Sequence, residues 1–253
     1  ELEVPLTHVY RTSIHDLVAP WDTCPVRCDM SFKEIQKKKV PSFVITQHFL
    51  SLREKYKAAE FDTDASKTSK ALSRAASGPL FTLSKTMNKN TSIFTAEAYV
   101  ILLALHHILQ NKIENAVVYT DSLSVVEKLS SLHVSRNPTF NDVLRALYSA
   151  YSLKLTVTVC WVPGHCGIAG NEAADRSAAD AALLDSVDIN QVPYQDLKPC
   201  VKRKLRDHWQ QQWDKEIDNK LHVVKPRLGV WESSHHRDRH HEVLTCRLRI
   251  GHS

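Results

Sequence analysis

The sequence predicts an α/β protein, because segments with strand character alternate with segments with helix character through its middle. Residues 116–120 read Ala-Val-Val-Tyr-Thr, a short apolar and β-branched run that is typical of a buried strand. Residues 95–110 have the length of a helix and are apolar nearly all round, so we expect that helix to be buried.

The other segments of the central region continue this alternation in chain order. The first strand is expected over residues 58–63, and a second strand after it is interrupted by Pro79. The remaining elements are a short strand near residues 80–83, helices over 122–132 and 138–151, a strand over 155–162 and a helix over 171–184.

Three regions follow from these patterns. Residues 1–57 have scattered prolines and predict irregular structure with one or two short helices, residues 58–186 form the α/β domain, and residues 187–253 form a basic helical flank. Leu205, Trp209, Trp213 and Ile217 recur at helical spacing among basic residues, which indicates a helix that packs on the domain or contacts nucleic acid.

Composition and charge restrict the class of protein. The chain has 253 residues, of which 43% are hydrophobic and 24% charged, as in ordinary globular proteins. The longest apolar run, about residues 98–105, is well short of the ~20 residues that a membrane span needs, so we expect no membrane partner. Residues 58–186 hold 12 acidic and 11 basic residues, whereas residues 187–253 hold 13 basic and nine acidic ones. An acidic centre with basic flanks is compatible with nucleic acid as a partner.

Four acidic residues stand where strands end or helices begin. Asp64 and Asp121 end predicted strands, while Glu97 and Asp175 lie near the starts of predicted helices. Open α/β sheets gather ligand groups at such places. A glutamate in a mostly apolar helix needs a partner or an ion. A single aspartate at a strand end is usually a turn or capping residue, so the interpretation depends on the whole set.

The most informative segment is residues 161–175, Trp-Val-Pro-Gly-His-Cys-Gly-Ile-Ala-Gly-Asn-Glu-Ala-Ala-Asp. It contains half of the six glycines in the chain, which permit unusual backbone angles and close approach of a polymer. Asn171 can cap the helix that carries Asp175.

These segments together resemble the type 1 ribonuclease H domain of non-LTR retrotransposon reverse transcriptases. The resemblance covers residues 58–186 and implies a mixed five-stranded sheet with flanking helices. It is carried by Thr-Asp-Ala-Ser-Lys at 63–67, Thr-Ala-Glu-Ala-Tyr at 95–99, Tyr-Thr-Asp-Ser at 119–122 and the stretch from Val162 to Asp175.

The resemblance also implies a role for each matching residue. Asp64 would bridge two magnesium ions, Glu97 and Asp121 would hold the ion near the leaving 3′ oxygen, and Asp175 would hold the ion that activates water. His165 would assist proton transfer or product release from the glycine loop. Carboxylate oxygens suit magnesium, with manganese as a substitute, and two ions ~3.5–4 Å apart can stabilise both the attacking and the leaving oxygen.

The implied activity is endonucleolytic hydrolysis of the RNA strand of an RNA–DNA hybrid. The hybrid would be recognised through its backbone and 2′-hydroxyls. The flanks, at residues 193–198 and 247–252, resemble the linker before a Cys/His-rich tail in the same polyproteins. We therefore expect the chain to belong to a longer reverse transcriptase polyprotein, with residues 1–57 as a remnant of the connection to the polymerase.

Two departures from the family pattern lie beside Asp64. Ala65 replaces the usual glycine, and Asp62 replaces an apolar residue. In a strand, Asp62 and Asp64 point to the same face roughly 7 Å apart. We assign the ligand to Asp64, because its neighbours match the family frame. The alternative hypothesis is a catalytically impaired nucleic-acid-binding remnant. A different metal-dependent nuclease or an integrase is disfavoured by the order of the acidic residues and the glycine loop.

Overall fold

The computed structural model describes residues 9–10, 24–35, 40–67, 72–78, 81–131, 135–164, 166, 168, 170, 172–173, 176, 188–229 and 238–251. The chain divides into two compact units, Glu1–Leu197 and Lys198–Ser253. The first unit contains the sheet and the candidate site, and the two units are described separately.

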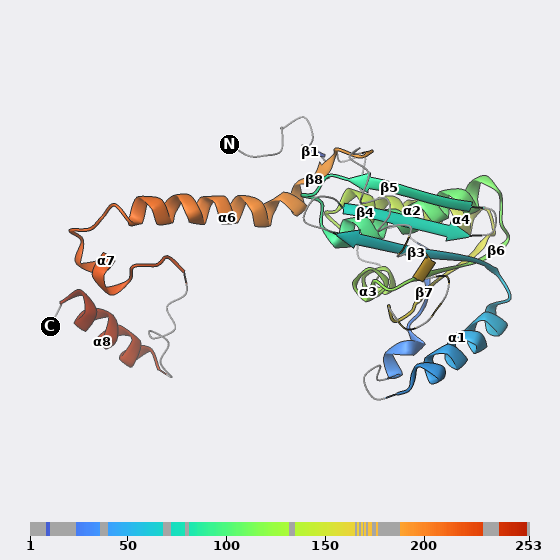
Figure 1. Cartoon of the computed structure of the whole chain (residues 1–253), viewed down its shortest axis with the longest axis horizontal. Coiled ribbons are helices and arrows are strands. Elements are labelled where there is room, and N and C mark those ends of the chain that lie inside the picture. The colour runs from blue at the N-terminus through green and yellow to red at the C-terminus, as the bar shows by residue number, and fades with distance from the viewer. Residues whose placement is uncertain are drawn as a thin grey trace. The chain divides into compact units, whose positions relative to one another are not determined.

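The first unit is built on a mixed sheet of six strands in the order β2-β7-β6-β3-β4-β5 (Figure 1). Strands β3 to β7 confirm the predicted mixed five-stranded sheet, in which β3, β6 and β7 are parallel and β4 and β5 are antiparallel to their neighbours. The region before residue 58 adds a sixth strand, β2, parallel to β7. The strands are β2 (Arg27–Asp29), β3 (Ala59–Lys67), β4 (Leu72–Gly78), β5 (Phe81–Met87), β6 (Asn115–Thr120) and β7 (Thr156–Trp161).

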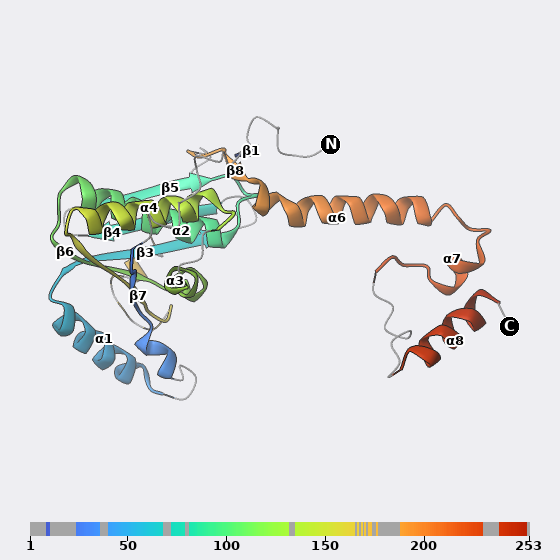
Figure 2. The same cartoon turned by 180° about the vertical axis from the view of Figure 1, so that it is seen from behind.

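Helices cover both faces of this sheet (Figure 2). Alternate residues of β6 point to opposite faces, as the pleat requires. Ala116 and Val118 pack with the helices α2 (Ile93–Gln110), α3 (Leu123–Ser130) and α4 (Pro138–Ser152). Val117 and Tyr119 pack instead with the 3₁₀-helix η4 (Ser31–Glu34) and the helix α1 (Ser42–Tyr56). The buried helix predicted near residue 95 is α2, and Ala98, Ile101 and Leu105 are fully inaccessible in it.

Helix α2 is also the one helix among the described residues that is long and apolar enough to cross a membrane. Just over half of its 18-residue window, 56%, is buried inside the protein. It packs against α4 and against strands β3 and β4, so its hydropathy is that of a core helix.

The described residues before residue 58 include a longer helix than the sequence predicts. Helix α1 has 15 residues, and it buries Ile45 and Leu52 against the sheet. Phe49 of the same face meets Tyr119 edge-on, with ring centroids 5.0 Å apart. Polar and charged residues make up more than half of α1, so this helix becomes stable by packing on β6 and β7 rather than by its own hydropathy.

The chain after residue 187 returns to the sheet before it leaves the first unit. Ile189 forms a parallel bridge with Met87 at the end of β5. Strand β8 (Val192–Pro193) pairs with β1 (Val9–Tyr10), and the first turn of helix α6 (Tyr194–Trp213) buries Leu197. Residues 188–197 therefore belong to the same compact unit as the sheet.

The second unit contains most of α6 and the helices α7 (Lys220–Val224) and α8 (Arg239–Ile250). The predicted helical spacing of Leu205, Trp209 and Trp213 is confirmed, whereas Ile217 follows the end of α6. Trp213 donates its indole N–H to the Lys225 carbonyl at 2.7 Å, while the Trp209 side chain is 60% exposed.

Candidate metal centre

The parallel pairing of β3 with β6 brings two aspartates together. Thr63 lies opposite Thr120 in this register, so the next residues along the two strands, Asp64 and Asp121, lie side by side where β6 ends. Neighbouring parallel strands end at the same edge of a sheet, which is why separate sequence segments can supply one site. Asp64 is buried, and Asp121 is half-buried.

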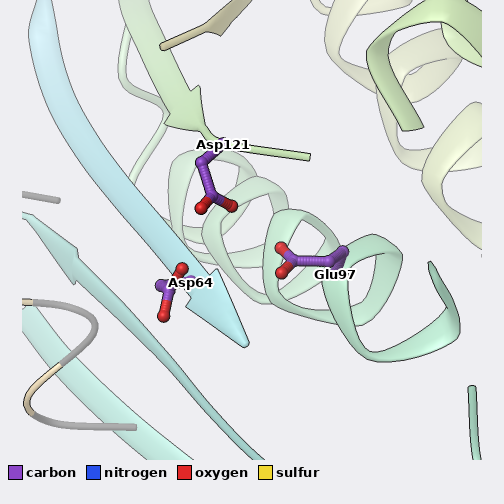
Figure 3. A group of neighbouring side chains, drawn as sticks. All are labelled: Asp64, Glu97 and Asp121. Atoms are coloured by element: carbon purple, nitrogen blue, oxygen red, sulfur yellow. The ribbon is translucent and has the colours of Figure 1, made fainter. Parts of the chain in front are cut away.

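Helix α2 supplies the third carboxylate. Glu97 is the fifth residue of α2, and its carboxylate points toward the space beside Asp64 and Asp121 (Figure 3). One oxygen from each of the three carboxylates lies within 4.8 Å of the others. The Ala65 amide donates a hydrogen bond to Glu97 Oε1 at 3.2 Å, which ties the helix to β3.

The environment of Glu97 opposes its negative charge. Burial, followed by the nearby charges of Asp121 and Asp64, raises the pKa of Glu97 well above its usual value, although the Ala65 hydrogen bond lowers it. Glu97 Oε2 is buried and has no hydrogen-bond partner among the described residues. A buried carboxylate oxygen without a donor, beside two more carboxylates, fits a hard divalent cation.

Asp121 is in close contact with the last residue of β7 and with the segment that follows it. The indole N–H of Trp161 donates to the Asp121 carbonyl at 3.0 Å. A Cβ atom at Gly164 would come within 2.4 Å of Asp121 Oδ2, so any larger residue there would displace the carboxylate. The first glycine of the predicted loop thus permits close approach to Asp121 rather than a special backbone angle.

Asp62 occupies a different place from Asp64, although both belong to β3. Asp62 lies opposite Tyr119, one step before the end of β6, and it is outside the carboxylate cluster. Its Oδ2 fits against Gly170, where a Cβ atom would come within 2.1 Å. Burial and the neighbouring Glu60 raise the pKa of Asp62 to about 6, while Arg53 lowers it. The structure therefore groups Asp64 rather than Asp62 with Glu97 and Asp121.

Ala65 fits its position without strain. It is paired with Arg74 in the regular antiparallel ladder. The described non-glycine residues with positive φ are Lys57, Lys112 and Lys154, so this position does not require the conformational freedom of glycine.

The remaining two predicted site residues, His165 and Asp175, lie outside the described residues, together with most of the predicted helix over 171–184. Of the five predicted site residues, the structure thus brings Asp64, Glu97 and Asp121 together.

The start of α2 depends on residues that the sequence pattern did not single out. Ser92 caps the helix, and its Oγ accepts a hydrogen bond from the Thr95 amide at 3.2 Å. Asn137, the cap of α4, donates to Thr95 Oγ1 at 2.7 Å in the buried interior. A serine directly before an apolar helical run is a recognisable capping signal, but nothing local connects it to Asn137.

Comparisons with known proteins relate part of this chain to one family. A model of the RNase H family matches residues 57–183. A ribonuclease H of Erythrobacter litoralis (strain HTCC2594) is 38% identical over 79 residues, which cover 27% of this chain and 55% of the relative. The chain thus spans about half the length of this curated relative. The N-terminal RNase H domain of rv2228c from Mycobacterium tuberculosis, solved as a fusion with maltose binding protein, superposes with a TM-score of 0.41 at 22% identity. That superposition covers 49% of this chain and 92% of the other chain.

Proposed function

The chain belongs to the RNase H family, and we propose on this premise that it hydrolyses the RNA strand of an RNA–DNA hybrid as an endonuclease. The observation that carries the proposal is the cluster of Asp64, Glu97 and Asp121, whose ligand oxygens lie within 4.8 Å of one another. This number of carboxylates in a small volume is electrostatically unfavourable unless cations are bound, which supports a metal-dependent nuclease.

Asp64, Glu97 and Asp121 would hold divalent cations, and we assign Asp175 to the same set. The family generally uses divalent metal ions, and we propose two Mg²⁺, with Mn²⁺ as a substitute. When bound, the ions would neutralise the scissile phosphate and lower the pKa of an attacking water.

The reaction adds water across one phosphodiester bond of the RNA strand. The water oxygen bonds to phosphorus while the bond from phosphorus to the 3′ oxygen breaks, which leaves a 5′-phosphate and a 3′-hydroxyl. We assign to His165 the transfer of the proton that the water loses or the 3′ oxygen gains, because a histidine can serve in either direction near neutral pH.

The partner in this proposal is the hybrid duplex itself. A duplex of this kind is read through its phosphates and 2′-hydroxyls, so its affinity should decrease with salt and depend little on base sequence.

Cleavage of an end-labelled hybrid by the whole chain in Mg²⁺ tests the proposal. Asp121→Asn should lower the cleavage rate by about 10²–10³-fold, as expected for the loss of one charge-stabilising group. Asp62→Asn is the matched control, since it makes the same change in the neighbouring strand outside the cluster, and it should retain the wild-type rate within about threefold. DNA–DNA and RNA–RNA duplexes of the same sequence should remain intact.

These experiments distinguish the proposed enzyme from the impaired remnant. The observation that favours the remnant is Asp62, a half-buried acidic residue on the same strand as Asp64. Wild-type protein that binds the hybrid without cleaving it, and cleaves once Asp62 is replaced by Asn, would establish the remnant. Equal losses in Asp62→Asn and Asp64→Asn would instead overturn the assignment of Asp64 as the ligand.

We also propose that the chain is part of a retrotransposon reverse transcriptase polyprotein, with residues 58–186 as its type 1 ribonuclease H domain. The support is the resemblance of residues 193–198 and 247–252 to the linker of such polyproteins. The transcript around the coding region tests this idea: a polymerase reading frame continuous with residue 1 is expected, and an unrelated or closed frame would contradict it.

A further inference from the structure

The segment after the family match contacts strand β5 and the start of α2, the helix that carries Glu97. Thr86 of β5 donates its amide N–H to Asp188 Oδ2 at 2.8 Å, and the Asp188 amide donates to Thr86 Oγ1 at 3.2 Å. Ile189 continues this docking with backbone hydrogen bonds to Thr86 and Asn88. Its side chain packs on the small cluster of Met87 and Ala96, which also touches Ala65. Ile189 therefore packs on a cluster that includes Ala96, the residue before Glu97. Ala65, whose amide donates to Glu97, packs on the same cluster.

A second contact from this segment is made with Ser92, the N-cap residue of α2. The Ser92 amide donates a hydrogen bond to Asp196 Oδ2 at 2.9 Å. Ser92 in turn accepts from the Thr95 amide, and Asn137 donates to the Thr95 hydroxyl. Asp196, Ser92 and Thr95 therefore form a continuous series of hydrogen bonds that ends two residues before Glu97.

Electrostatic repulsion acts on the start of α2 through Glu97. Glu97 faces Asp64 and Asp121, and the three like charges repel one another whenever no cation lies between them. A helix end that is hydrogen-bonded only within itself frays most easily. The hydrogen bond from the Ser92 amide to Asp196 opposes that movement from outside the helix.

We propose that Asp196 is a positioning residue for Glu97, with Asp188 as a second anchor of the same segment. By holding Ser92, Asp196 keeps the first turns of α2 in the position from which Glu97 meets Asp64 and Asp121. Asp196 lies beyond residue 183, where the family match ends, so this chain supplies the support from its own flank. The inference rests on the proposed metal centre, because it concerns the position from which Glu97 would bind a cation.

Titration of the whole chain with Mn²⁺ alone, followed by isothermal calorimetry, tests this role. Asp196→Ala should weaken Mn²⁺ binding by about tenfold, which is typical for the loss of a group that orients a metal ligand. Asp196→Asn keeps an oxygen that accepts from Ser92, so its affinity should stay within about twofold of wild type. Asp207→Ala removes an exposed aspartate from the same helix and is the matched control, with no expected change.

The affinity for Mn²⁺ separates positioning from stability, because calorimetry well below the melting temperature measures the folded protein. Should Asp196→Ala not fold, Asp188→Ala releases the other anchor while Asp196 stays in place, and a weaker effect of the same sign is expected. Wild-type affinity in the folded alanine variants would overturn the proposal. If the wild-type chain itself bound no Mn²⁺ and Asp64→Asn made no difference, the proposed metal centre would fail instead.

Discussion

Asp29 and Glu97 are two buried acidic residues of the same unit, and their surroundings differ. Asp29, at the end of β2, accepts hydrogen bonds from Lys55 Nζ at 2.8 Å, from the Tyr56 hydroxyl at 2.5 Å and from the Ser31 amide at 2.9 Å. Glu97 accepts one hydrogen bond among the described residues, from the Ala65 amide, and its nearest charged neighbours are carboxylates.

The pKa values follow this difference. Burial alone would raise the pKa of Asp29, but the hydrogen bonds from Lys55, Tyr56 and Ser31 outweigh it and hold the pKa well below its usual range. At Glu97, burial and like charges act in the same direction and raise the pKa. A buried carboxylate with hydrogen-bond donors from the protein contributes to stability. A buried carboxylate beside other carboxylates is a candidate cation ligand.

Neutralising Glu97 should produce the largest effect and the sharpest contrast. We expect Glu97→Gln to lower the cleavage rate by about 10²–10³-fold. The same variant should melt at a higher temperature than wild type without metal, because the repulsion from Asp64 and Asp121 is removed. Cleavage assays and metal-free melting curves check the two parts, and a metal-free destabilisation would mean that Glu97 is satisfied as Asp29 is.

Removal of Asp29 should damage stability and leave the metal centre intact. Asp29→Ala removes the acceptor for the charged amine of Lys55 and for the neutral donors of Tyr56 and Ser31. It should lower the free energy of unfolding by about 2–3 kcal/mol. Urea unfolding measures this change, with Tyr56→Phe as a milder control that loses one hydrogen bond, or about 1 kcal/mol. A reduced affinity for Mn²⁺ in Asp29→Ala would show that the two sites are not independent.

The pH dependence of stability without metal should be the smallest of the three effects. Asp29 and Glu97 should contribute to it with opposite signs. The pKa of Asp29 is lower in the folded than in the unfolded state, so its stabilisation is present above the unfolded pKa of about 3.9 and is lost as the pH falls below it. The pKa of Glu97 is higher in the folded state, so stability should decrease as the pH rises above the unfolded value of about 4.3. Urea midpoints across this range should lose the acid limb in Asp29→Asn and the alkaline limb in Glu97→Gln. An unchanged profile in either variant would contradict the corresponding assignment.

Much of the fold was predictable because its signals are local. The apolar run at residues 116–120 and the helix that begins near residue 95 correspond to β6 and α2 within two residues. Strand alternation also predicted that Asp62 and Asp64 share a face. It could not predict which of them meets Glu97, because that depends on the register of β3 against β6.

The sequence by itself therefore determined the α/β class, the order of the strands and helices through β7, and the positions of Asp64, Glu97 and Asp121 at their ends. Each of these depends on the residue types within a few positions, through side-chain periodicity and backbone preference. Only the tertiary structure decided that β2 and α1 complete the sheet, that Asp29 is satisfied by Lys55 and Tyr56, and that Asp196 holds the start of α2. These contacts join residues 26 to 131 positions apart, from Lys55 with Asp29 to Arg27 with Thr158. Such pairs leave no periodic signal, because chain folding alone brings them together.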